Sequence, residues 1–325
     1  MSFRTRSMPR HAGPGLMLSR RRMAVGGLCL CCLPSRIRPA AAEAARMAQV
    51  APGIFVRQGL TEDASGANGD AIANIGFVVG RDAVAVFDPG GSLEDGESLR
   101  LAIRQETHLP IRYVILSHVH PDHVFGAAAF MSDRPVFVGH ARLSAALALR
   151  GAYYRRRLDE ILGAGHAGPV VMPTLLVHDR AELDLGRRRL LLTAHAPAHT
   201  DSDLSMVDPA TRTLFAGDLL FVNRVPALDG DLKGWLAELA KLRAADVARA
   251  VPGHGPVGVD WPGAAADIER YLSVLLDGTR EAVTRGVPIE AAVARVAQSE
   301  RGRWKLFDDY NARNVIEAYR QLEWE

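Results

Sequence analysis

Metal-binding side chains are concentrated in one short segment of the sequence. Four candidate ligands lie within six positions: His118, His120, Asp122 and His123. Imidazole nitrogens and carboxylate oxygens are suitable zinc donors. The apolar run 111–116 comes directly before them, so they follow a predicted strand and precede a predicted helix. A strand end holds side chains rigidly and the turn after it fans them out, so this pattern predicts a metal site in preference to a solvated, histidine-rich turn.

Three later segments each supply one more candidate ligand after a predicted strand. His199 lies in Pro-Ala-His-Thr, Asp218 in Phe-Ala-Gly-Asp and His254 in Val-Pro-Gly-His-Gly. A lone histidine or aspartate would mean little, but with the first cluster these residues make seven nitrogen or oxygen donors. Seven donors are enough for two metal ions with coordination positions left open, so the sequence predicts a two-metal site.

The elements that must position these ligands alternate between strand-like and helical patterns. Short apolar runs separated by Gly or Asp predict strands at 54–56, 75–79, 83–87, 111–116, 136–138, 175–177, 190–193, 204–207 and 213–216. The first three should be adjacent and antiparallel, with a loop at 61–70 that we expect to be mobile. Helical spacing appears at 93–106, from near His123 to Phe130, at 142–162, and through most of the chain from Lys233 onward. This order predicts an α/β fold in which two sheets pack face to face with helices outside and no linker divides the chain.

The first 44 residues differ from the rest of the chain in composition. They hold eight arginines and one acidic residue, then an apolar run at 23–33 and a small-residue stretch at 40–44, which is typical of an export signal. The apolar run is too short to span a bilayer. Residues 19–23, Ser-Arg-Arg-Arg-Met, resemble the twin-arginine signal, with ordinary secretory export as the alternative. We expect 1–44 to be the signal, 45–325 the catalytic domain, and the mature protein to be periplasmic or secreted without a stable membrane span.

Composition argues against several other classes of protein. The net charge is +2, 23% of residues are charged and 6% are aromatic; with no fixed internal period, these values do not indicate a nucleic-acid binder, a solenoid or a disordered scaffold. All three cysteines, Cys29, Cys31 and Cys32, lie in the predicted signal. A cleaved protein would therefore have neither a disulfide nor a cysteine ligand.

The ligand pattern resembles that of the metallo-β-lactamase superfamily, whose motifs are HxHxDH, a later His, an Asp and a final His. The resemblance runs from about residue 50 to residue 260 and fills every metal position. It implies an αββα fold with the site at one edge of two mixed sheets. It also implies that His118, His120 and His199 bind the first zinc, that Asp122, His123 and His254 bind the second, and that Asp218 bridges them.

Details of the ligand set indicate particular branches of that superfamily. The bridging Asp218 with Asp122 and His123 is similar to the glyoxalase II, lactonase and arylsulfatase-like branches. Stretches at 196–203, 217–221, 234–236 and 311–315 resemble exported zinc metallohydrolases that accompany quinoprotein dehydrogenase systems. This resemblance implies a small-molecule substrate and suggests periplasmic quinoprotein dehydrogenase components as partners.

The resemblance also implies a mechanism. A hydroxide held between two zinc ions would attack an ester, thioester, lactone or amide carbonyl, since bound water has a lowered pKa in such a field. Asp122 and Asp218 would be the catalytic carboxylates. Asp88 would accept a hydrogen bond from a ligand histidine and orient its ring, although an Asp before Pro also forms turns, and both roles are compatible.

Other residues near these motifs are given structural roles or left open. Thr200 could support His199 or cap the next turn, while His140 and His195 are expected to be structural. Arg224 and the run 153–157 could bind an anionic substrate, although a solvated helix face is the simpler explanation for that run. Four polar residues near the C-terminus are expected to pack against the sheet: Tyr310, Asn311, Asn314 and Tyr319.

Two other functions fit the same ligands. One is a non-catalytic accessory protein that holds a metal or a quinone-type cofactor in an exported redox pathway. The other is an iron-dependent enzyme similar to persulfide dioxygenases, since iron or mixed metals could occupy these positions.

Overall fold

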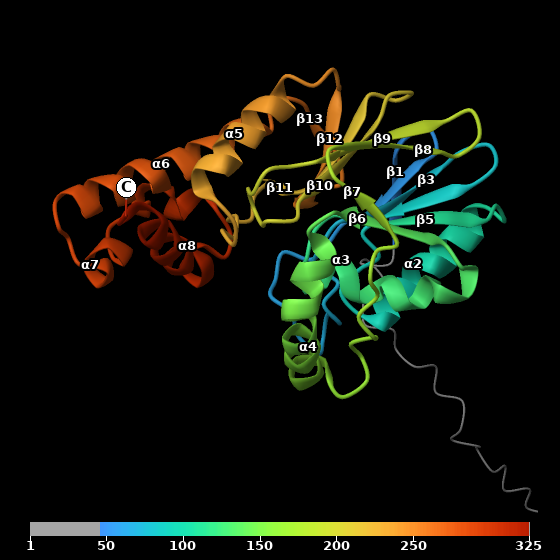
Figure 1. Cartoon of the computed structure of the whole chain (residues 1–325), viewed down its shortest axis with the longest axis horizontal. Coiled ribbons are helices and arrows are strands. Elements are labelled where there is room, and N and C mark those ends of the chain that lie inside the picture. Colours follow the sequence, from blue (N-terminus) through green and yellow to red (C-terminus); the bar gives the residue numbers. More distant parts are fainter. Residues whose placement is uncertain (1–45, 325) are drawn as a thin grey trace, which may run out of the picture. The chain divides into compact units, whose positions relative to one another are not determined.

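Two β-sheets form the centre of this computed structural model, which describes residues 46–324 (Figure 1). The predicted export signal therefore lies outside the described residues. The first sheet has seven strands in chain order: β1 (Met47–Ala51), β2 (Ile54–Arg57), β3 (Ile75–Val79), β4 (Val84–Phe87), β5 (Ile111–Leu116), β6 (Val136–His140) and β7 (Leu175–Val177). Strands β1 to β4 pair antiparallel, and β4 to β7 pair parallel.

The parallel half of this sheet needs helical crossovers, because parallel neighbours cannot be joined by a tight turn. Helix α2 (Leu93–Glu106) joins β4 to β5. The short helix α3 (Pro121–Val124) and the 3-10 helix η1 (Phe125–Asp133) join β5 to β6. Helix α4 (Leu143–Leu162) leads from β6 toward β7.

The second sheet has six strands in the order β13 (Val259–Asp260), β12 (Arg249–His254), β11 (Thr213–Phe221), β10 (Leu204–Asp208), β9 (Arg189–Ala194) and β8 (Arg180–Asp184). Its strands pair antiparallel except for β11 and β12, which are joined by α5 (Leu232–Arg243) and run parallel. The C-terminal elements are α6 (Ala265–Thr284), α7 (Ile289–Val293), η2 (Gln298–Arg303) and α8 (Phe307–Leu322).

Three hydrophobic cores define four layers. Strand β4 shows why: Val84 and Val86 face the core under α2, η1 and α4, whereas Ala85 and Phe87 face the second sheet. Successive strand residues point to opposite faces, so a strand buried on both faces is apolar throughout. A third core, around Trp235, packs α5, α6 and α8 on the outer face of the second sheet. The predicted α/β fold with αββα layers is confirmed.

Most predicted elements occur where the sequence places them, but two predictions were wrong in detail. The helix expected from His123 to Phe130 starts at Pro121, whose fixed φ suits a first helical position, and continues from Phe125 as the tighter η1. The region from Lys233 onward, expected to be mostly helical, contains two strands of the second sheet, β12, which ends at His254, and the edge strand β13. Within residues 46–324, no helix combines the length and apolar character needed to cross a membrane.

The core between the sheets gives a stability prediction. The Phe215 side chain is buried there, with its ring centroid 5.2 Å from that of Phe87. We expect Phe215→Ala to lower the free energy of unfolding by about 3–5 kcal/mol, because it removes buried apolar area and leaves a cavity. Chemical denaturation measures the change. Leu101→Ala is the control, since that side chain is 61% exposed and its loss should cost less than about 0.5 kcal/mol; equal effects of the two variants would contradict the assigned core.

Candidate metal centre

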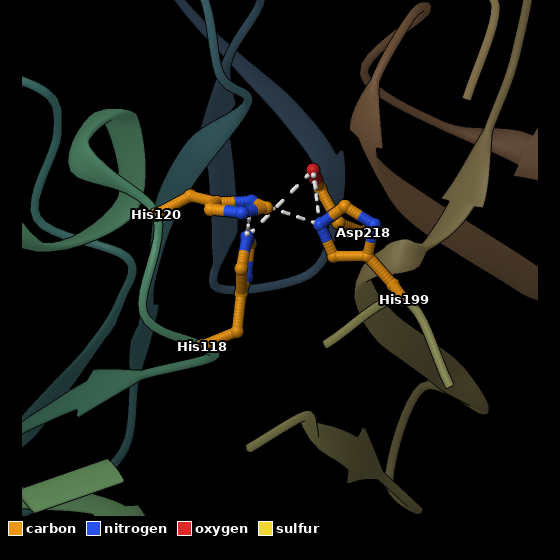
Figure 2. Close-up of side chains that lie close together, drawn as sticks. All are labelled: His118, His120, His199 and Asp218. Carbon is orange, nitrogen blue, oxygen red and sulfur yellow. Dashed lines mark hydrogen bonds and ion pairs between the residues drawn. The ribbon is translucent and has the colours of Figure 1, made fainter. Parts of the chain in front are cut away.

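All seven predicted ligands converge in two adjacent groups. One contains His118, His120, His199 and Asp218, and the other contains Asp122, His123 and His254; within each group, one donor atom per residue lies within 4.8 Å of the others. Figure 2 shows the first group with the Asp218 carboxylate facing the three imidazoles. All of these residues are buried except His120, whose side chain is 18% exposed, so the site opens to solvent on the His120 side.

The first four ligands are spread along one turn between β5 and η1. His118 and His120 follow the end of β5, and Asp122 and His123 belong to α3. Pro121 occupies the first position of α3 and His120 its N-cap, which directs the two pairs to different sides of the turn. Strand ends and a short helix thus bring sequence neighbours to two separate groups.

The other three ligands come from the second sheet. His199 lies in the loop after β9, Asp218 lies within β11, and His254 is the last residue of β12. Strands β11 and β12 approach so closely here that a Cβ at Gly253 would lie 1.9 Å from Asp218 Oδ1. Glycine is therefore required at position 253 for the Asp218 carboxylate to occupy the site.

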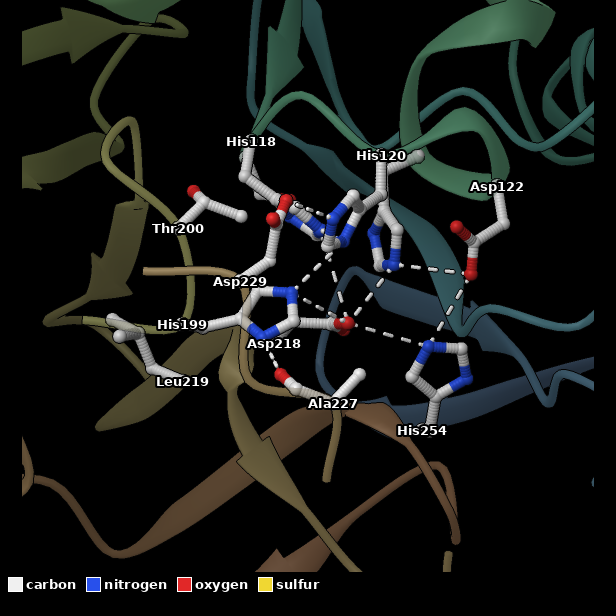
Figure 3. Close-up of polar contacts among 12 residues, drawn as sticks. His118, His120, Asp122, His199, Thr200, Asp218, Leu219, Ala227, Asp229 and His254 are labelled. Atoms are coloured by element: carbon white, nitrogen blue, oxygen red, sulfur yellow. Dashed lines mark hydrogen bonds and ion pairs between the residues drawn. The ribbon is translucent and has the colours of Figure 1, made fainter. Parts of the chain in front are cut away.

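Each of the five histidines has its outer nitrogen bonded to an oxygen. His199 Nδ1 donates to Ala227 O at 2.7 Å and His254 Nδ1 to Ile72 O at 3.0 Å. His123 Nδ1 donates to Asp88 Oδ2 at 2.7 Å, and His120 Nε2 donates to Asp229 Oδ2 at 2.9 Å. Figure 3 shows the contacts of His199 with Ala227 and of His120 with Asp229.

The fifth histidine, His118, has its outer nitrogen bonded to the hydroxyl oxygen of Ser117. Ser117 Oγ donates its proton to Asp88 Oδ2 at 2.8 Å, so it accepts from His118 Nδ1 at 2.9 Å. Asp88 also accepts the Ser117 backbone N–H at 2.8 Å and has a φ of +55°. The two sequence interpretations of Asp88, turn former and support for a ligand histidine, therefore both hold.

This bonding leaves five imidazole lone pairs and two carboxylates directed at one another. His120 Nδ1 lies 3.1 Å from His118 Nε2 and 3.0 Å from His199 Nε2, although none of these atoms then carries a proton to share. His123 Nε2 and Asp218 Oδ1 are buried and have no hydrogen-bond partner among residues 46–324. Such a donor set fits cations, because only a positive charge satisfies converging lone pairs.

The pKa shifts reflect the same arrangement. Burial lowers the pKa of His118 well below its usual value and that of His199 to about 3. Both rings are therefore neutral, and the Nε2 atom of each is unprotonated. Although burial opposes it, the carboxylates of Asp218, Asp122 and Asp88 raise the pKa of His123 well above its usual value. Metal binding to the second group must therefore displace a proton.

Asp218 lies between the two groups. Its Oδ2 is 3.3 Å from His199 Nε2 and 3.4 Å from His254 Nε2, and its Oδ1 is 3.2 Å from His123 Nε2. Burial raises its pKa, but the neighbouring histidines, His254 first, hold that pKa well below its usual value. The carboxylate is therefore ionised and contacts ligands of both groups.

Asp229 was not identified in the sequence analysis. Its carboxylate accepts from His120 Nε2 and from Arg150, whose guanidinium reaches it from α4. Burial raises its pKa, but the hydrogen bond from His120 and the charge of Arg150 hold the pKa at about 2. The only sequence signal was an Asp next to a Gly in the segment after β11, which is indistinguishable from an ordinary turn residue.

Arg224 and the run 153–157, which the sequence analysis considered as possible anion-binding residues, make contacts within the protein. Arg224 is buried, lies 3.1 Å from His254 Nδ1 and donates to the Tyr310 hydroxyl at 3.0 Å, so it is engaged within the protein. In the run 153–157, Arg155 and Arg157 are exposed and form ion pairs with Asp159 and Glu160, as expected of a solvated helix face, whereas Tyr154 is only partly exposed.

The remaining candidates have structural contacts. His140 Nδ1 accepts the Arg142 backbone N–H at 2.9 Å, and His195 is bonded to Glu238 and to Ser205. Thr200 Oγ1 donates to Asp203 at 2.7 Å, so it stabilises its own turn and makes no bond to His199. His140 and His195 are thus structural, as expected.

Polar residues of the last helix anchor loops and neighbouring helices. Asn314 Nδ2 donates to Pro226 O at 2.7 Å, and its Oδ1 accepts from Leu228 N at 2.9 Å. Asn311 accepts from the Tyr271 hydroxyl, and the Tyr319 hydroxyl donates to Val287 O at 3.0 Å. Asn314 therefore holds the loop that carries Ala227 and Asp229, although packing against the sheet was the role expected for it.

The Asp229 contact gives a prediction about metal affinity. We expect Asp229→Ala to weaken metal binding by about 10- to 100-fold, because His120 loses the carboxylate that orients its ring and makes it more basic. Chelator competition measures the affinity. Asp246→Ala serves as the control, since that side chain is 90% exposed; identical affinities for both variants would show that Asp229 does not support His120.

Comparisons with known proteins agree with this geometry. The sequence profile of the metallo-beta-lactamase superfamily matches residues 68–254. A linear primary-alkylsulfatase of a Pseudomonas species is 23% identical over an alignment of 211 residues that covers 54% of this chain and 40% of that protein. A human acyl-coenzyme A thioesterase is 30% identical over an alignment of 189 residues that covers 50% of this chain and 61% of that protein. The chain thus spans less than two thirds of the length of either relative.

Solved structures share the fold at low sequence identity. The sec-alkylsulfatase Pisa1 from a Pseudomonas species has a TM-score of 0.62 at 17% identity, covering 85% of this chain and 50% of that one. A metallo-beta-lactamase from Pontibacter korlensis has a TM-score of 0.58 at 16% identity, covering 70% of this chain and 98% of that one. With the profile match over the region that holds all seven clustered side chains, this chain belongs to the metallo-beta-lactamase superfamily.

Proposed function

We propose that this protein is a dinuclear, zinc-dependent hydrolase. His118, His120 and His199 would hold one ion, Asp122, His123 and His254 the other, and Asp218 would bridge them. The observation that carries this proposal is the set of five inward imidazole lone pairs, each fixed by an outer hydrogen bond to oxygen. Nitrogen and oxygen donors in this number suit zinc, and iron is the main competitor.

The protein residues prepare the site for hydrolysis. Two bound ions would supply a water of lowered pKa and polarise the scissile bond. Asp122 and Asp218 are the carboxylates in the donor set; charges from His123 and His254 offset the effect of burial and keep the pKa of both well below normal. They are therefore ionised and can accept hydrogen bonds from water. The partly exposed His120 marks the side from which substrate enters.

The substrate class follows from the bonds that such a site can cleave. We propose an ester, thioester, lactone or amide of a small molecule. The human relative named as an acyl-coenzyme A thioesterase supports the thioester, and the alkylsulfatase relative adds a sulfate ester to the bonds worth testing.

We also propose that the protein acts after export. The support is the arginine-rich, apolar leader in residues 1–44. A periplasmic location would be compatible with the proposed quinoprotein dehydrogenase partners, for which sequence resemblance is the only support.

The proposal predicts the behaviour of Asp218→Ala. We expect about two zinc ions per chain in the purified wild type, a clear loss on mutation, and hydrolysis reduced by about 10³-fold or more, since several kcal/mol of transition-state stabilisation would be lost. Elemental analysis and a panel of esters, thioesters, lactones, amides and alkyl sulfates measure both effects.

Asp246→Ala is again the matched control and should retain metal and activity. If the purified protein held one iron ion per chain and catalysed oxygen-dependent sulfur chemistry, it would be a redox enzyme and not a hydrolase. A protein without metal, or a metal-loaded protein that hydrolyses none of the panel, would refute the proposal.

A further inference from the structure

Helix α4 exposes an apolar stripe beside the metal centre. The stripe consists of Ala145, Ala148, Leu149, Ala152 and Tyr153, all exposed and all within one side of the helix by their three- and four-residue spacing. Leu149 is 80% exposed and Tyr153 is 52% exposed. The outward face of a surface helix is normally polar, so an apolar stripe on this face indicates a binding surface.

The same helix also faces the site. Arg150 and Tyr154, which directly follow the two large stripe residues, turn inward: Arg150 bonds Asp229, and its Nη1 lies 3.5 Å from the Tyr154 hydroxyl. Burial raises the pKa of Tyr154, and the nearby charges of Asp229 and Asp122 add to this effect. The inward side of α4 is therefore part of the wall of the metal centre.

Aromatic rings connect the centre to the stripe. The His120 and Tyr154 ring centroids are 6.4 Å apart, and those of Tyr154 and Tyr153 are 5.9 Å apart. The chain of rings begins at the one candidate ligand that is partly open to solvent and ends on the outer face of α4. Arg156 covers the far side with its guanidinium 5.5 Å from the Tyr153 centroid. A path of rings thus leads from the candidate metal centre to the outer face of α4.

We propose that this path binds the apolar chain of the substrate. The inference rests on the proposed hydrolase function and assigns Leu149 and Tyr153 as specificity-determining residues for an acyl or alkyl chain. Because a carbon–carbon bond of about 1.5 Å advances an extended chain by only about 1.25 Å, a chain of about ten carbons reaches across both ring-to-ring steps. The protein should therefore prefer substrates with chains of that length over acetyl substrates.

The geometry favours a single chain over a membrane or a protein partner. The stripe is one helix wide, and its two large residues adjoin the two that face the metal centre. A bilayer or a protein surface would cover a broader area than one helix face, and Arg155 and Arg157 beside the stripe are paired with acidic neighbours on α4.

The test compares chain-length preference in wild type and the double variant Leu149→Ser/Tyr153→Ser. The substrates are p-nitrophenyl esters with acyl chains of about 2 to 12 carbons, and the readout is kcat/KM. We expect wild type to prefer the ten-carbon ester over the acetate by about tenfold or more, since a buried methylene can contribute about 0.8 kcal/mol. In the double variant this ratio should fall below about threefold.

A matched control removes exposed apolar residues elsewhere. Leu101→Ser/Met131→Ser changes side chains that are 61% and 55% exposed on α2 and η1, and it should keep the wild-type ratio. A wild type without chain-length preference, or a double variant that loses activity equally on all esters, would overturn the inference.

A binding measurement separates this inference from the proposed function. Decanoate should bind the metal-loaded wild type in a calorimetric titration and bind the double variant at least about tenfold more weakly. If no ester is hydrolysed, the proposed hydrolase function is refuted. The decanoate titration still shows whether the stripe binds an apolar chain. Co-sedimentation with phosphatidylcholine and phosphatidylglycerol vesicles that depends on Leu149 and Tyr153, without chain-length preference, would make the stripe a membrane surface and refute the inference.

Discussion

The convergence of lone pairs on two neighbouring points is the constraint on which the rest of the structure depends. The unprotonated inner nitrogens of His118, His120 and His199 repel one another at about 3 Å, so these three rings do not hold one another in place. The force that fixes them comes from outside, where each histidine donates to an oxygen of a side chain or the backbone. Those oxygens belong to segments far apart in the sequence, so the site can form only when both sheets are assembled.

The sandwich satisfies this constraint by bringing the ends of several strands to one edge. The cluster after β5 comes from the first sheet, while His199, Asp218 and His254 come from the second. Asp88 connects the strand ends to the ligands. It directly follows β4, accepts the backbone N–H of Ser117 after β5, and orients the ring of His123. Packing between the sheets therefore determines the distances among the ligands, and a shift of one sheet would move ligands apart within each group.

The ligands could be predicted from sequence because their residue types are unusual and their spacing is local. His118 to His123 lie in a single turn, and the three later ligands each follow or end an apolar run with Gly or Pro beside them. The supporting residues could not be predicted in the same way. Asp229 and Asn314 are common polar residues in a turn and on a helix, and their roles arise from contacts across 109 positions with His120 and 88 with Pro226. The strand β12 was obscured by Pro252 and Gly253, which interrupt the pattern where the chain must pass close to Asp218.

The hydrogen bonds of Asn314 determine where the functional domain ends in the sequence. The superfamily profile ends at residue 254, and a fragment that stopped there would contain all seven clustered side chains. It would lack α8, whose Asn314 and Gln321 hold the loop 226–232 by four hydrogen bonds. That loop carries the oxygens that orient His120 and His199. The functional unit is therefore longer than the region that sequence comparison recognises, and expression of an isolated core would yield a chain with every ligand and a poorly aligned site.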